Sequence, residues 1–512
     1  MLGRRMALVF YAKILRQALG LVAVMFTGRL LGPEVMGLTG FAQAFIGLVW
    51  FLAEFGMEPT HAKLIHETGD VESCVGALAV LKIAFSVVAA VVVLGWLGIY
   101  AHQHPFENPE QVTVILLWLA GNVIANLSNI ATYTFTARKE VAKSETVEIV
   151  ETIISLIFNV AIALAMRNGQ PYAATMLAAA YIGSNLFSFA LSLYMLRGIR
   201  LRRPSKDLLK RYLSFASSMA IIAAFTSVVL YVDRVMIGTY YSEKEVGWYH
   251  AATRLNRILL FFSGAAMTIL TPSFFEHVAK RNFEGVRDLM YKAERYLSLV
   301  VTLCVMEMII CARPLVRITL GDQYDSSIII LQIISIIALV STLGRPVSAF
   351  IITMNRPRVY IAQTAGSVVA VVILNFLMVP KVLWGIPMLG WGGMGAALNT
   401  AVVSVISLII GKVIIWRWTK IAMYWGVFKH LGAALLTGAV AMGLQRGLGY
   451  SDWVAVPVNT IGGTLSYFLL LYFSHEFSKA DVLYIYGNVH PTVVRQYAGD
   501  ELRGPAADGD KA

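Results

Sequence analysis

Three basic residues spaced along one apolar segment are the clearest candidates for chemistry in this chain. His250, Arg254 and Arg257 follow one another at i, i+4 and i+7, so on a helix they share one face. At the rise of an α-helix, the stripe would reach roughly 12–16 Å in from one end of the segment. A guanidinium offers paired donors and keeps its charge in a poor dielectric. The stripe therefore predicts a site for a phosphate group.

Two residues at the end of the preceding apolar segment, Asp233 and Arg234, are expected neighbours of this stripe. One hypothesis makes both of them part of the same binding site. The alternative is an ion pair between Asp233 and Arg254 that only fixes one helix against the next. The sequence leaves both readings open.

Four further basic residues complete the set of candidate binding residues: Lys13, Arg16, Arg29 and Arg345. Lys13 and Arg16 lie three apart and can share a helical face, where they either line the inner mouth of a cavity or reach the lipid headgroups. Arg345 precedes a proline that we expect to interrupt its helix, so it either bonds the freed carbonyl groups or lines the cavity.

Acidic residues are scarce at depth, and Glu307 is the most deeply placed of them. A further set of charged residues lies near inner helix ends and is expected at the membrane interface: Glu54, Glu58, Lys82, Glu148 and Glu151. A lone carboxylate within an apolar segment is protonated or paired. Glu307 is therefore either a coupling-ion site or a neutral acid bonded to a neighbour. A cavity with many arginines and few acids suits an anionic substrate better than an organic cation.

The composition requires these residues to work inside a membrane. Hydrophobic residues make up 58% of 512 and charged residues 14%, and the mean hydropathy is +0.68, whereas a soluble domain is about a quarter charged. The three cysteines form no ligand spacing, and the basic residues do not gather on a soluble surface as nucleic-acid binding needs. The chain holds no P-loop, HExxH, CxxC or GxSxG motif. We expect neither an enzyme, a metal, a cofactor nor a nucleic-acid partner.

The apolar segments predict an all-α polytopic membrane protein with about fourteen transmembrane helices, since one crossing takes about 20 apolar residues. We place them near 8–31, 37–58, 77–100, 112–136, 146–166, 172–196, 212–240, 246–271, 293–320, 327–353, 358–379, 390–411, 428–446 and 455–474. The predicted division is a six-helix lobe at 1–196, a basic cytoplasmic linker at 197–211, a second six-helix lobe at 212–416, two extra transmembrane helices at 417–475 and a cytoplasmic tail at 476–512.

Lysine and arginine in the short loops predict the orientation, because cytoplasmic loops carry the excess of these residues. With the N-terminus inside, basic residues of the inner loops far outnumber those of the outer loops, and the linker RGIRLRRPSKDLLKR is the most basic stretch. Both termini are then cytoplasmic, and the protein is a multi-pass protein of the cell (inner) membrane.

The two predicted lobes resemble each other. The stretch containing Gly37 corresponds to the one containing Gly247, and the surroundings of Asn159 correspond to those of Asn375. Each match pairs one span with the sixth span after it, so both lobes point the same way. This pattern favours a parallel repeat around a central cavity.

Several stretches in matching order resemble the polysaccharide flippases, the O-antigen or lipid-linked oligosaccharide translocases of the multidrug/oligosaccharidyl-lipid/polysaccharide (MOP) superfamily. They are GRLLGPEVMG, DRVMIG followed by EVGWYHAATRL, PSFFEH, LGDQYDSSIIILQI, and LNFLMVPK leading to GWGGMGAALNT. The resemblance implies two six-helix bundles that carry a polyprenyl-(pyro)phosphate-linked oligosaccharide from the inner to the outer leaflet. Positively charged cavity residues would then meet the phosphate.

The expected function is a flippase that exports lipopolysaccharide or another surface glycan by alternating access. Its expected partners are the lipid-linked oligosaccharide, membrane lipids, and a polysaccharide polymerase or glycosyltransferases. Two alternatives remain open: a cation-coupled multidrug exporter of the same superfamily, and a non-transporting membrane scaffold for polysaccharide synthesis. An exporter needs a cluster of acids within the membrane, and a scaffold would tolerate loss of every cavity charge.

Overall fold

The computed structural model describes residues 2–477 apart from 105, 107, 168–169 and 355. These residues are almost entirely helical. The helices of the first part are α1 (Leu2–Val49), α2 (Phe51–Glu54), α3 (Met57–Thr68), α4 (Val71–Gln103), α5 (Glu110–Ala137), α6 (Val141–Ala165) and α7 (Ala173–Met195). Then follow α8 (Lys206–Tyr240), α9 (Glu243–Ala279), α10 (Phe283–Ile310), α11 (Ala312–Thr319), α12 (Ser327–Thr353), α13 (Pro357–Met378), α14 (Gly392–Thr419), α15 (Gly426–Leu448) and α16 (Asp452–Phe473). A 3-10 turn (Asp322–Tyr324) and a hairpin of β1 (Val382–Leu383) and β2 (Ile386–Pro387) complete the described structure.

Helices dominate because a chain in lipid must satisfy its backbone hydrogen bonds within each segment. Within the described residues, eleven helices are long and apolar enough to cross a membrane, or twelve if the bent pair α10 and α11 is one span. The all-α polytopic class is thus confirmed, while the exact number of fourteen stays a prediction. The span expected at 293–320 is not straight, because α10 and α11 meet at 63°.

Helix α1 is broken at Gly32, whose φ of 88° lies in the region that favours glycine. Before the break, Arg16 contacts Glu145 near the start of α6. After it, Glu54 accepts a hydrogen bond from Tyr133 near the end of α5. Because α5 ends and α6 begins within a few residues of each other, positions 16 and 54 lie at the same end of the molecule. The chain therefore reverses at Gly32.

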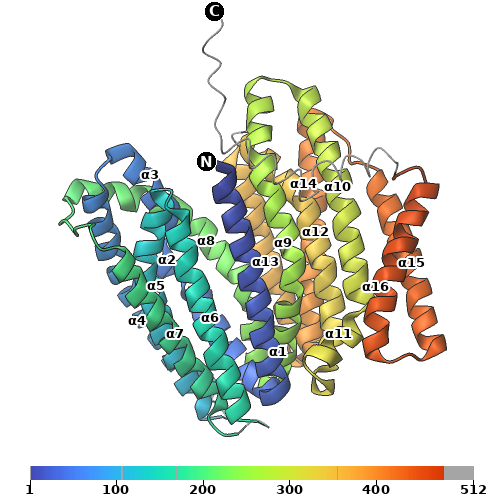
Figure 1. Cartoon of the computed structure of the whole chain (residues 1–512), viewed down its shortest axis with the longest axis horizontal. Coiled ribbons are helices and arrows are strands. Elements are labelled where there is room, and N and C mark those ends of the chain that lie inside the picture. Colours follow the sequence, from blue (N-terminus) through green and yellow to red (C-terminus); the bar gives the residue numbers. More distant parts are fainter. Residues whose placement is uncertain (1, 105, 107, 168–169, 355, 478–512) are drawn as a thin grey trace, which may run out of the picture.

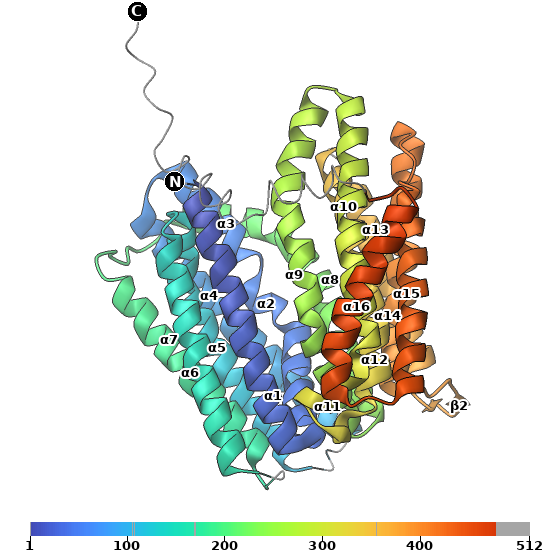
Figure 2. The ribbon, with the colours of Figure 1, turned by 45° about the vertical axis from the view of Figure 1, so that its right-hand side comes forward.

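The helices gather into two groups that diverge toward the end that holds the N-terminus (Figure 2). Helices α1–α7 form one group, α9–α14 form the other, and α8 passes from the first toward the second (Figure 1). Helices α15 and α16 stand at the outer side of the second group, next to α10 (Figure 1). The residue boundaries predicted for the lobes and the linker stay predictions.

At the end opposite the N-terminus, the two groups meet backbone to backbone. A Cβ on Gly37 would lie 1.7 Å from the carbonyl oxygen of Glu243, and one on Gly247 would lie 1.9 Å from that of Pro33. Only glycine at both positions allows so close an approach. These are the two glycines that the internal repeat pairs with each other, and their contact closes this end of the space between the groups.

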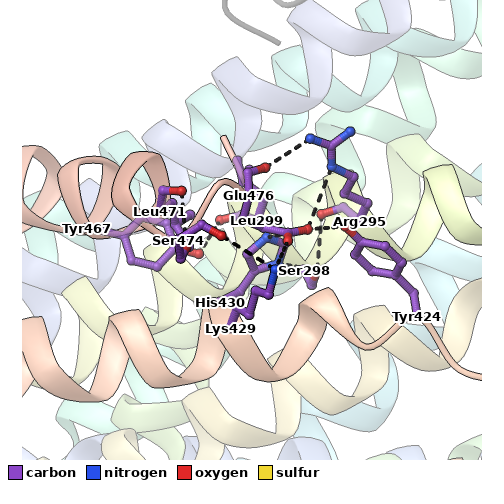
Figure 3. A network of polar contacts seen from close by, with 10 residues as sticks. All are labelled: Arg295, Ser298, Leu299, Tyr424, Lys429, His430, Tyr467, Leu471, Ser474 and Glu476. Carbon is purple, nitrogen blue, oxygen red and sulfur yellow. Dashed lines mark hydrogen bonds and ion pairs between the residues drawn. The ribbon is translucent and has the colours of Figure 1, made fainter. Parts of the chain in front are cut away.

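A buried carboxylate anchors the segment that follows α16 (Figure 3). Glu476, only 6% exposed, accepts hydrogen bonds from Tyr424 and, at 3.0 Å, from Lys429. Its backbone oxygen accepts from Arg295 of α10 at 2.9 Å, and beside it His430 pairs with Ser298 at 2.7 Å. This network ties the α15–α16 hairpin to α10.

Candidate functional site

A cavity of about 660 Å³ lies between the two groups of helices. Its lining comes from α1, α2, α5, α6, α7, α8 and α9. The glycine contact between α1 and α9 lies at one end of it, and the lining continues from there toward the N-terminal end as far as Gly20, Glu54 and Arg257. The cavity therefore lies where the two groups diverge (Figure 2).

One wall of the cavity, formed by α8 and α9, carries the predicted basic stripe. Arg234, His250, Arg254 and Arg257 all line the cavity. Arg234 and His250 are 7% and 3% exposed, so their polar atoms are largely shielded from water and lipid. The structure places these four side chains in one cavity, and their role in binding stays a prediction.

His250 stands between two guanidinium groups. Its Nδ1 lies 3.2 Å from Arg234 Nη1, and its Nε2 lies 3.2 Å from Arg254 Nε. A neutral imidazole accepts a hydrogen bond at one nitrogen only, so His250 satisfies one of these two arginines at a time. Arg254 also donates to the side-chain oxygen of Gln43 on α1 at 3.0 Å.

The basic wall lacks a counter-charge. Among the described residues, no carboxylate lies within ion-pair distance of Arg234, Arg254 or Arg257. Three guanidinium groups close to one another without an acid repel each other, and that of the buried Arg234 is also poorly solvated. Such a wall is suited to bind an anion with several oxygen acceptors.

Asp233 lies behind this wall and faces the other way. It accepts hydrogen bonds from Tyr249 at 2.5 Å, from Asn375 of α13 at 2.8 Å and from Thr400 of α14 at 3.0 Å. The structure thus shows no ion pair between Asp233 and Arg254. The carboxylate joins α8 to α9, α13 and α14 of the second group and does not line the cavity.

The basic residues predicted from α1 lie apart from the stripe. Arg16 pairs with Glu145 at 3.0 Å and with Glu148, and the side chain of Lys13 is exposed. Arg29 is exposed near the opposite end, where it donates to the carbonyl oxygen of Ile318 at 2.6 Å. None of the three is among the residues that line the cavity.

The two remaining candidates belong to the second group of helices. Arg345 is exposed on α12 and does not line the cavity. The expected interruption at Pro346 is wrong, because α12 continues through it from Ser327 to Thr353. Glu307 faces Gly463 of α16, and neither of its carboxylate oxygens has a partner among the described residues.

The sequence interpretation missed the wall opposite the arginines. This wall is formed by residues of three helices: Trp118 and Asn122 of α5, Glu151 and Asn159 of α6, and Tyr181 of α7. A signal for it was present, because Glu151, Ser155 and Asn159 recur every four residues in an otherwise apolar segment. Glu151 was instead expected to lie at the membrane interface.

A comparison with models of protein families finds a match over more than half of the chain. A family model described as "Polysaccharide biosynthesis protein" matches residues 26–329. A similar sequence is the probable low-salt glycan biosynthesis flippase Agl15 of Haloferax volcanii, which is 20% identical over 484 residues that cover 91% of this chain and 94% of that protein.

Solved structures share the fold. The lipid II flippase MurJ in an inward closed conformation matches with a TM-score of 0.70 at 12% identity, over 92% of this chain and 99% of that one. A multidrug resistance MATE family transporter of the MOP superfamily, in an inward-facing conformation, matches with a TM-score of 0.65 at 16% identity. The match covers 80% of this chain and 96% of that one.

Proposed function

Because this chain belongs to the polysaccharide biosynthesis protein family, we propose that it is a flippase for a lipid-linked oligosaccharide. The proposed substrate carries a phosphate or pyrophosphate between its polyprenyl lipid and its glycan. The protein moves this headgroup from the inner to the outer leaflet of the cell membrane, with both of its termini in the cytoplasm.

The uncompensated arginines of the cavity carry the proposal. Arg234, Arg254 and Arg257 line the cavity, with no carboxylate within ion-pair distance among the described residues. A phosphate oxygen accepts charge-assisted hydrogen bonds from guanidinium groups, which are roughly twice as strong as neutral ones. The anionic group of the substrate supplies the counter-charge that the protein itself leaves out.

The physical need for such a cavity follows from the cost of crossing hydrocarbon. Each unsatisfied polar group of a sugar phosphate costs several kcal/mol in the bilayer core. A basic, hydrated cavity between two bundles removes much of this cost. Rocking of the two helix groups, which would separate the contact at Gly37 and Gly247 while the opposite end closes, then exposes the cavity to either side in turn.

A cation-coupled drug exporter of the same superfamily is the second candidate, because two acids, Glu54 and Glu151, also line the cavity. Glu54 already has the buried cation Lys82 as a partner at 3.0 Å. That leaves Glu151 as the acid available to a cationic drug, facing three arginines. The balance of charge therefore favours an anionic substrate. Glu307 remains our proposed coupling-ion site, outside the cavity between α10 and α16.

The test is complementation of a strain that lacks its own copy of this protein. Arg254→Ala and Arg257→Ala are expected to lower surface glycan roughly tenfold or more, since each removes charge-assisted hydrogen bonds, while the lipid-linked precursor accumulates. Arg446→Ala, which removes an exposed arginine at the end of α15, is the matched control and should complement fully.

Three outcomes of this assay count against the flippase. If the cavity variants insert normally and complement as well as Arg446→Ala, the basic wall is not the binding site. If they are silent while Glu307→Gln alone abolishes function, the exporter is favoured. If deletion of the gene causes no accumulation of precursor, the protein does not move that substrate.

A further inference from the structure

The cavity wall that faces the arginines presents an aromatic surface. The rings of Trp118 on α5 and Tyr181 on α7 stack with their centroids 4.0 Å apart and their planes 27° apart. A Cβ at Gly121, also on α5, would lie 2.5 Å from the Tyr181 ring. This glycine therefore lets Tyr181 lie flat against α5 beside Trp118, and both side chains line the cavity.

Acceptor groups surround this aromatic surface. The amide nitrogen of Asn122 donates to the carbonyl oxygen of Trp118 at 2.8 Å, and that of Asn159 donates to Ser155 at 3.2 Å. Within the described part of the chain, no group donates to the side-chain oxygen of either asparagine. Glu151 accepts one hydrogen bond, from Ser184 at 3.4 Å, and has no cation within ion-pair distance among the described residues.

A donor on the same wall also lacks a partner. The indole nitrogen of Trp118 is shielded from solvent and makes no hydrogen bond within the described structure. A buried indole N–H usually finds an acceptor, because an unsatisfied one is costly. The wall thus presents flat apolar rings and three oxygen acceptors to the cavity, with this indole N–H shielded behind them.

We propose that this wall, which we call the sugar wall and define as Trp118, Asn122, Glu151, Asn159 and Tyr181, binds the first sugars of the glycan. The inference rests on the proposed flippase function, and it adds the place in the cavity at which the glycan binds. The apolar C–H face of a pyranose ring packs on the aromatic rings, as aromatic side chains offer an apolar face with polar groups at the rim. Its hydroxyl groups donate to the two amide oxygens and, with charge assistance, to Glu151.

The two walls give the substrate one orientation. The arginines of α8 and α9 hold the phosphate group, and the sugar wall of α5, α6 and α7 holds the glycan across the cavity. Tyr181 lies near both Glu151 on its own wall and Arg254 on the opposite wall, so it links the two walls. A sugar joined directly to the phosphate can therefore reach the sugar wall.

The same groups can be read as a site for an organic cation, since aromatic rings and a carboxylate also attract positive charge. The arginines opposite argue against that reading, because they raise the local positive potential. We therefore make cation binding an outcome of the test.

The experiment compares two probes on the purified full chain in lipid nanodiscs. One probe is geranyl diphosphate, and the other is geranyl diphosphate that carries a single N-acetylglucosamine. The double variant Asn122→Leu/Asn159→Leu is expected to weaken binding of the sugar-bearing probe about tenfold, as for loss of one or two hydrogen bonds, and to leave the sugar-free probe unchanged. Arg254→Ala should weaken both probes.

Asn129→Leu is the matched control, because Asn129 is on α5 and does not line the cavity. If both probes bind, Arg254→Ala weakens both, and the double variant acts like Asn129→Leu, the sugar wall is rejected and the flippase stands. If neither probe binds the unaltered protein, the proposed function fails and the sugar wall with it. If the double variant weakens binding of tetraphenylphosphonium instead of the sugar-bearing probe, the wall is a cation site.

Discussion

At the scale of single residues, the first group of helices contains a buried lysine with a defined set of partners. Lys82 of α4 is fully buried, and its amino group donates to Glu54 at 3.0 Å and to the side chain of Asn126. Glu54 also accepts from Tyr133 at 2.7 Å. The charge is tolerated because the amino group has two oxygen acceptors, one of them a carboxylate, and lies over the ring of Tyr133. These contacts join α2, α4 and α5.

Removal of one partner of this pair should destabilise the protein strongly. Glu54→Ala leaves Lys82 charged and buried without its counter-charge, which costs about 3–5 kcal/mol. The double variant Glu54→Gln/Lys82→Met removes both charges and should recover most of the loss. Unfolding of the purified protein by detergent or heat measures the stability of the two variants against that of the unaltered protein. Equal stability of Glu54→Ala and the unaltered protein would show that Lys82 finds another partner.

Residue types and spacing place His250, Arg254 and Arg257 on one helical face, because they repeat with the period of one helix, and in the structure all three line the cavity. They failed for Lys82 and Glu151, which were expected at the membrane interface. The depth of a side chain in a bundle depends on which face of its helix meets another helix. That information is not in the spacing of residues within one segment. For the same reason, the spacing did not show that Asp233 bonds to α13 and α14 and not to Arg254.

At the scale of elements, the contact at Gly37 and Gly247 sets how closely the two groups of helices approach. Gly37→Ala places a methyl group against the backbone of Glu243, with no flexible side chain that could move aside. We expect a loss of about 1–3 kcal/mol, as for overpacking in a protein core. Gly95→Ala is the control, since nothing lies within 4 Å of a Cβ there. Equal midpoints of thermal unfolding for Gly37→Ala and Gly95→Ala would contradict the close contact.

The attachment of the α15–α16 hairpin should depend on pH through Glu476. Burial raises the pKa of Glu476, but hydrogen bonds from Tyr424 and Lys429 outweigh it, so that the pKa lies below the ordinary value. A carboxyl group with a lowered pKa in the folded state stabilises at neutral pH, and this stability is lost as the pH falls below about 4.

We therefore expect the unfolding midpoint to fall on acidification, and Glu476→Gln to have a smaller pH dependence in this range. Thermal unfolding of both proteins at several pH values from neutral to acidic measures this dependence. Glu34→Gln is the control, because the Glu34 side chain is 70% exposed. A pH dependence that is the same for Glu476→Gln and the unaltered protein would mean that the network in Figure 3 contributes no stability.

The sequence predicted most helices, and it separated 8–31 from 37–58 where α1 is broken at Gly32, but it missed two features of the second group. Long apolar runs predict helices directly, because lipid leaves the backbone no other solution. The bend between α10 and α11 and the continuous α12 through Pro346 were not foreseen. Both depend on neighbouring helices that support or replace backbone hydrogen bonds, and hydropathy does not record such neighbours.

At the scale of the whole molecule, the distribution of basic residues predicts which end faces the cytoplasm. The linker at 197–211 leads into α8 on the side of the N-terminus, and the β1–β2 hairpin lies at the opposite end (Figure 2). The excess of arginine and lysine on the first side should hold it inside. The cavity, which lies toward that end, then faces the leaflet in which we propose the substrate is loaded.

Labelling of single cysteines tests this orientation in intact cells. With Cys74, Cys304 and Cys311 replaced by alanine, Trp384→Cys should react with a membrane-impermeant maleimide, because Trp384 is 89% exposed in the hairpin. Arg203→Cys, in the exposed linker, should react only after the membrane is made permeable. The reverse pattern would place the cavity toward the outside in this conformation and would contradict loading from the inner leaflet. Labelling of both sites from outside would contradict an odd number of crossings between residues 203 and 384 and, with it, the predicted arrangement of the second lobe.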